Sequence, residues 1–115
     1  MKTIIAGSRT IDDYDAICQI IIDSCFVITE VVSGTARGVD RLGEQWAREN
    51  NILIKRFPAN WSKYGKAAGP IRNEEMVKYA EAAIIVRSDH SKGATSMANL
   101  AKQYGLKVRL VDIYG

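Results

Sequence analysis

The sequence has little of what a metal site or a disulfide needs. Its 115 residues include one histidine and two cysteines, without the clustered spacing of zinc or iron ligands. Cys18 and Cys25 are seven residues apart in a segment of helical periodicity, which separates them by about 10 Å along a helix axis, beyond disulfide reach. We therefore expect two buried thiols, no metal and no resident cofactor.

Long apolar runs are also absent. No segment approaches the roughly 20 apolar residues of a membrane span, and MKTIIAGSRT becomes polar too early for a secretory signal. The net charge of +3 is, as a total, a weak argument for nucleic-acid binding. We expect a cytoplasmic protein without a membrane partner. With 47% hydrophobic residues, residues 1–115 suit one compact domain.

Runs rich in isoleucine and valine alternate with segments of helical period, separated by Gly, Ser, Asn or Pro. The expected strands are residues 3–6, 30–33, 52–57, 82–86 and 107–111. The expected helices are residues 13–25, 39–49, 71–80 and 94–104. This alternation predicts an α/β fold, a parallel five-stranded sheet with helices on both faces.

Positive charge gathers in the connections that follow the strands. The residues in or beside these connections are Arg9, Arg37, Lys63, Lys66, Arg72 and Lys92. Ligands of open parallel sheets bind beyond the carboxyl ends of the strands, where helix N-termini expose N–H groups. The sequence therefore predicts one basic mouth in a nearly neutral protein.

A glycine-rich turn joins a strand to a helix in VVSGTARGVDRLGEQWA, residues 31–47. Gly34 and Gly38 permit positive φ or close backbone approach, and Thr35 offers a hydroxyl. The segment matches neither the dinucleotide fingerprint nor the P-loop pattern. Its spacing leaves a phosphate-binding loop and a plain tight turn both open.

Two acids in the following helix are candidate catalytic residues. Asp40 and Glu44 are four residues apart and share a helix face, so they suit a ribose-binding or acid–base pair. The structural alternative is that Asp40 complements the helix dipole while Glu44 is solvated or pairs with Arg41 or Arg48.

The longest connection, residues 58–73, is typical of a functional loop. It offers groups for stacking on a base and for binding phosphate: Trp61, Tyr64, Lys63, Lys66, Arg72 and Asn73. Alternatively, Trp61 caps the core and Pro70 starts a helix. Later, Ser91, Gly93 and Thr95 stand at another expected helix N-terminus, where Ser91 suits the N-cap and a second phosphate or ribose contact is possible.

Four segments in order, GSRTIDDY, VSGTARGVDRLGEQWA, FPANWSKYGKAAGPIRNEEM and SKGATSM, resemble the YspA-like, YpsA-related branch of the SLOG superfamily. This Rossmann-like group includes DprA and the LOG nucleotide phosphoribohydrolases. The resemblance implies a single SLOG-like domain that binds a nucleoside phosphate or an ADP-ribose-like ligand at the strand ends, and it leaves a homodimer or higher homo-oligomer open. By position it implies these ligand-binding residues: Gly7, Ser8, Arg9, Ser33, Gly34, Thr35, Arg37, Gly38, Asp40, Lys66, Gly69, Arg72, Asn73, Ser91, Gly93 and Thr95.

Two departures from the related motifs shape the functional hypotheses. Ala94 stands where the branch has threonine, and Met97 falls near the catalytic glutamate of the LOG enzymes. Because methionine cannot activate water, the first hypothesis is a nucleotide sensor or sequestering module. An N-glycosidic-bond hydrolase would use Asp40 or Glu44, with Arg72 on the phosphate. A third hypothesis is DprA-like binding of single-stranded nucleic acid, with Trp61 stacking on a base.

Overall fold

The structure is a computed structural model that describes residues 1–88 and 91–113, and its centre is a five-stranded parallel sheet. The strands are β1 (Lys2–Gly7), β2 (Glu30–Ser33), β3 (Leu53–Arg56), β4 (Ala82–Arg87) and β5 (Lys107–Asp112). Their order across the sheet is β3-β2-β1-β4-β5, and every neighbouring pair is parallel. The predicted Rossmann-like α/β fold with five parallel strands is confirmed.

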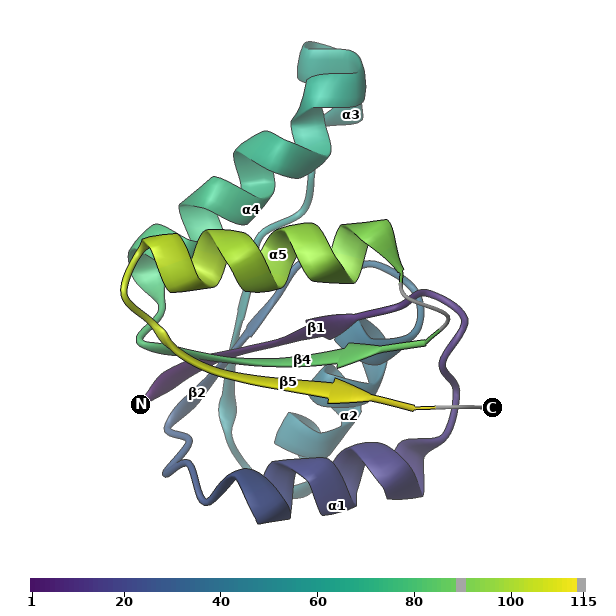
Figure 1. Ribbon diagram of the computed structural model, residues 1–115, viewed down its shortest axis with the longest axis vertical. Coiled ribbons are helices and arrows are strands. Elements are labelled where there is room, and N and C mark those ends of the chain that lie inside the picture. Colours follow the sequence, from purple (N-terminus) through teal and green to yellow (C-terminus); the bar gives the residue numbers. More distant parts are fainter. Residues whose placement is uncertain (89–90, 114–115) are drawn as a thin grey trace.

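Helices cover both faces of the sheet. They are α1 (Tyr14–Ser24), α2 (Val39–Glu49), α3 (Trp61–Tyr64), α4 (Ala68–Tyr79) and α5 (Lys92–Gln103), with a 3₁₀ turn η1 (Gly65–Ala67) before α4. Figure 1 shows α4 and α5 on one face and α1 and α2 on the other. In the described part of the chain, no helix combines the length and apolar character needed to cross a membrane.

The central strands are buried on both faces, which explains their unbroken apolar runs. In β1, Ile4 packs in the core beneath α4 and α5, whereas Ile5 packs in the core beneath α1 and α2. Ile85 and Ile84 of β4 divide between the two cores in the same way. The edge strand β3 is largely exposed, because only one side of it pairs with another strand.

The point where the chain changes direction across the sheet lies between β1 and β4. From β1 the chain runs outward to β2 and β3, then returns to β4 and continues to β5 on the other side. A Cβ at Gly7 would lie 1.9 Å from the carbonyl oxygen of Val86, so only glycine allows these strand ends to approach. Ligands of open α/β sheets bind at such a switch point.

The expectation of a long loop after β3 is wrong, because most of that connection is helical. Asn60 caps α3 by accepting a hydrogen bond from the Lys63 amide at 3.1 Å. η1 follows, and α4 begins at Ala68, before the expected start at residue 71. Pro70 lies in the first turn of α4, where its missing N–H breaks no hydrogen bond.

The two cysteines are free, as expected, but the expected burial of both is wrong. Cys18 is half-buried on α1, whereas Cys25 is exposed. Cys25 caps the C-terminus of α1 in the left-handed conformation, with φ of 59°, and its backbone amide donates to the carbonyl of Ile22.

Candidate functional site

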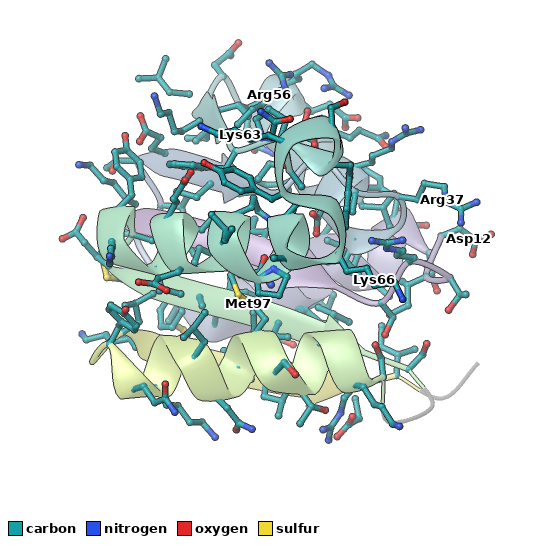
Figure 2. The ribbon with its side chains drawn as sticks, turned by 90° about the horizontal axis from the view of Figure 1, so that it is seen from above. Asp12, Arg37, Arg56, Lys63, Lys66 and Met97 are labelled. Atoms are coloured by element: carbon teal, nitrogen blue, oxygen red, sulfur yellow. The ribbon has the colours of Figure 1, made fainter. Side chains whose placement is uncertain are left out.

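A cavity of about 600 Å³ opens at the switch point, which is a size typical of small-molecule sites. The loops after β1 and β2 form one side, and α4 and α5 form the other. It brings together eleven of the predicted ligand-binding residues: Gly7, Ser8, Arg9, Gly34, Asp40, Trp61, Gly69, Arg72, Asn73, Ser91 and Gly93. Figure 2 shows this region from the side of α4 and α5, with Met97 between the two helices.

The glycine-rich turn has positive φ at Gly38, as its sequence allows, and also at Thr35. Thr35 has φ of 65°, an uncommon conformation for a β-branched residue, and its amide donates to the Ser33 hydroxyl at 3.1 Å. Gly34 is instead required for space. A Cβ there would lie 2.8 Å from both Nη1 of Arg72 and Oδ2 of Asp40, so the two charged groups pack over the bare glycine backbone.

Gly38 and Ser8 join the first two loops. Gly38 has φ of 76°, and a Cβ on it would lie 2.3 Å from the carbonyl oxygen of Ser8. The Val39 amide, the first of α2, donates to that same oxygen at 3.4 Å. The Ser8 hydroxyl accepts from the Ser88 amide at 2.9 Å, so Ser8 also anchors the loop after β4.

Asp40 is a buried carboxyl at the wall of the cavity. Its side chain is in the first turn of α2 and only 5% of the residue is exposed. Oδ2 accepts from the Ala36 amide at 3.1 Å. Burial raises the pKa of Asp40 to about 6, although the Ala36 hydrogen bond and the charges of Arg72 and Arg9 act in the opposite direction.

Glu44 does not share that cavity. Its carboxylate accepts from the Ser33 hydroxyl at 2.6 Å and from Nε of Arg56 at 2.9 Å, and Nη1 of Arg48 lies 3.9 Å away. These contacts face a separate depression on the β3 side of α2. The structure therefore does not bring Asp40 and Glu44 together at one cavity, and Glu44 instead ties α2 to β2 and β3.

Arg72 supplies positive charge to the cavity wall from the first turns of α4. Its Nη1 donates to the Gly34 carbonyl, and its Nε donates to Oδ1 of Asn73 at 2.8 Å. Burial lowers the pKa of Arg72, while Asp40 raises it, and an arginine so placed stays charged. Arg72 thus joins α4 to the glycine-rich turn across the site.

The loop after β4 and the start of α5 offer fewer free hydroxyl groups to the cavity than expected. Ser91 caps α5 by accepting from the Ala94 amide at 3.4 Å. The Thr95 hydroxyl donates to the Ser91 carbonyl and accepts from Nη1 of Arg87, each at 2.9 Å, and Thr95 does not line the cavity. Arg87 is held in turn by Asp112, with contacts of 2.6 and 3.0 Å.

The remaining predicted ligand-binding residues lie beside the cavity. Thr35 and Arg37 line a neighbouring depression, and Ser33 is buried beneath the turn. Lys66 is exposed on η1 and lines none of these depressions. Figure 2 shows Lys66 and Arg37 at the same end of the molecule, where the strands finish.

Several cavity residues were not predicted as ligand contacts: Ala6, Thr10, Ala36, Met76, Ser88, Ala94 and Met97. Helical periodicity offered a signal for Met76, which follows Arg72 by four residues on α4. Thr10 and Ser88 gave no local signal, since their hydroxyls meet at 3.2 Å across 78 residues of sequence.

A five-stranded parallel sheet with a cavity at its switch point is typical of a Rossmann-like α/β domain. A model of the YspA, cpYpsA-related SLOG family matches residues 1–64, and the chain belongs to this family. The chain is also 31% identical over 117 residues to the Gene 61 protein of Mycobacterium phage D29, with 93% of each chain covered. No solved structure matches it. The matched family segment ends in α3, so the contributions of α4 and α5 to the site come from the structure.

Proposed function

We propose that the protein binds a nucleotide or a nucleotide-derived ligand in the cavity and acts as a sensor or sequestering module. The observation that carries this proposal is that the charged groups of Arg72 and Asp40 both pack over Gly34 at the switch point. A guanidinium recognises phosphate, and a carboxylate accepts hydrogen bonds from sugar hydroxyls. The two groups a nucleotide needs therefore stand side by side.

The rest of the cavity suits the other parts of a nucleotide. Arg9 adds a second positive charge, and the N-terminal end of α5, which suits an anion, reaches the cavity wall at Gly93. Met76 and Met97 provide apolar surface, and Trp61, 53% exposed at the rim, is placed to stack on a base. Family membership is consistent with a nucleotide-type ligand.

Hydrolysis of the N-glycosidic bond is the second candidate, favoured by one observation. Asp40 is a buried carboxyl in the cavity with a pKa of about 6, which suits acid–base chemistry near neutral pH. Among the described residues that line the cavity, however, Asp40 is the only acid, and Met97, near the position that the resemblance gives to the LOG glutamate, cannot activate water. Glycoside hydrolysis generally uses two carboxyl groups, so binding is the better supported function.

The test is to incubate the purified protein with a mixed nucleotide panel that includes AMP, NAD and ADP-ribose, and to analyse bound ligand and released products by mass spectrometry. We expect one intact nucleotide to be retained. Arg72→Gln and Arg9→Gln should each weaken its binding roughly tenfold or more, the effect of losing one charged hydrogen bond. Arg109→Gln on β5, which removes the same charge away from the cavity, should not.

Product analysis separates the two candidates. Release of free base with ribose phosphate would identify a hydrolase, and Asp40→Asn should then abolish turnover while binding persists. A folded protein that neither retains a nucleotide from the panel nor releases products from one would contradict both candidates.

A further inference from the structure

A second depression of about 310 Å³ adjoins the main cavity and is lined by four arginines. We call it the arginine annex and define it by Arg9, Arg37, Arg41 and Arg72. Arg9 and Arg72 line both spaces, as does Gly34, so the annex continues directly from the main cavity. Its other wall comes from the turn after β2 and from Pro58 and Ala59 of the connection after β3.

Among the described residues, three of the four annex arginines have no ion-pair partner. None of its described lining residues is acidic, and within the described chain Arg9, Arg37 and Arg41 form no ion pair. The arginines just beyond it differ. Arg48 and Arg56 share one acidic partner, since both form an ion pair with the Glu44 carboxylate, at 3.9 and 2.9 Å.

The positions of Arg37 and Arg41 oppose the stability of α2. Arg37 precedes the helix and Arg41 lies in its first turn, at the end where the helix dipole disfavours positive charge. The two guanidinium groups also line the same small depression, where their like charges repel each other. An anionic ligand would turn both costs into attraction, since the helix N-terminus and the two guanidinium groups would then share one negative partner.

We propose that the annex binds the phosphates of the nucleotide beyond the first, so that the ligand is a nucleoside diphosphate or triphosphate. This inference rests on the proposed function. The single acid among the described lining residues of the two spaces, Asp40, lies in the main cavity. The sugar therefore belongs beside Asp40, the first phosphate at Arg9 and Arg72, and the terminal phosphates at Arg37 and Arg41.

The charge pattern favours a compact polyphosphate over a strand of nucleic acid. Beyond Arg41 the surface continues into a third depression, where the Glu44 carboxylate stands between Arg48 and Arg56. A strand following the arginines would meet this carboxylate and arginines that are already paired. A di- or triphosphate is shorter and would end before it reaches the Glu44 carboxylate.

The experiment compares the affinities of mono-, di- and triphosphates of the common nucleosides by calorimetric titration, with inorganic tripolyphosphate as a probe without a base. Divalent cations are left out so that the arginines are the main counterions. We expect the triphosphate of the preferred nucleoside to bind at least roughly tenfold more tightly than its monophosphate, since each added charged contact is worth about that much. Arg41→Gln should reduce this ratio several-fold, and Arg109→Gln should leave it as in the wild type.

Each other outcome overturns the inference in a recognisable way. Equal affinity for mono- and triphosphate would refute the annex while leaving the proposed function intact. If the protein binds tripolyphosphate but binds none of the nucleotides, both the proposed function and the inference built on it are refuted. An oligonucleotide that binds more tightly than every triphosphate, with an affinity that falls steeply with salt, would assign the arginines to nucleic acid.

Discussion

Burial of the Asp40 carboxyl opposes folding at neutral pH. The carboxyl is 5% exposed and accepts one backbone amide, yet burial still raises its pKa from 3.8 to about 6. Ionised Asp40 therefore costs the folded protein free energy at neutral pH. A group retained at such a cost is typical of a functional site.

Asp40→Asn should stabilise the protein at high pH. Between pH 4 and 6 the folded protein binds more protons at Asp40 than the unfolded chain, so stability contributed by this group falls as pH rises and levels off above the folded pKa. Because asparagine does not ionise, the variant does not lose this stability as the pH rises. Its free energy of unfolding should exceed that of the wild type by about 1–3 kcal/mol at pH 8 and match it near pH 4.

Urea unfolding of both proteins at pH 4 and pH 8 measures this difference. Asp12→Asn, which changes an exposed aspartate, is the matched control and should stay within about 0.5 kcal/mol of the wild type. An Asp40→Asn protein less stable than the wild type at pH 8 would contradict the burial argument.

Gly34→Ala should damage the site, because its methyl group would lie 2.8 Å from both Arg72 Nη1 and Asp40 Oδ2. We expect nucleotide affinity to fall roughly tenfold or more as the guanidinium moves, with about 1–3 kcal/mol of stability lost to overpacking. Gly93→Ala is the control for stability: no protein atom lies within 4 Å of the added carbon, and alanine should stabilise α5 by about 0.5–1 kcal/mol. Titration and thermal unfolding of both variants test this, and equal effects would contradict it.

At the scale of elements, α2 is held to the sheet by Glu44. Its contacts with Ser33 and Arg56 connect the helix to β2 and β3, and Asp40, one turn earlier on α2, reaches the cavity from the same helix. Two acids that look equivalent in sequence therefore have different environments. One lines the cavity and the other makes structural contacts.

Glu44→Gln should destabilise the protein by about 1–3 kcal/mol, since it removes charge from a buried carboxylate whose partners remain. Nucleotide affinity should change less than about threefold, because the residue lies outside the cavity. Unfolding and titration of this variant, beside Asp40→Asn, should give stability changes of opposite sign at pH 8. A large loss of affinity with unchanged stability would place Glu44 in the site instead.

The elements followed from the sequence where hydrophobic periodicity was strong. The expected strand at 30–33 matches β2, and the helix at 39–49 matches α2. Each of the other strands differs by one residue at one or both ends. The connection after β3 was mispredicted because its helices are short and start from a local cap at Asn60. A turn of four residues carries too little periodicity to reveal a helix.

At the scale of the whole molecule, topology explains why much of the cavity could be predicted. Parallel strands end at one edge, so the loops carrying Gly7, Gly34 and Ser91 had to meet there. Side-chain direction could not be predicted in the same way. Thr95 turns to Arg87 because Asp112 of β5 holds that arginine, an arrangement that depends on residues far apart in sequence.

The most direct test of the central claim is the titration of the wild-type protein with individual nucleotides at moderate salt. The account predicts saturable binding of one nucleotide per chain, weakened roughly tenfold or more by Arg72→Gln and unaffected by Arg109→Gln. A folded wild-type protein that binds no nucleotide, or one whose affinity is the same after Arg72→Gln, would contradict it.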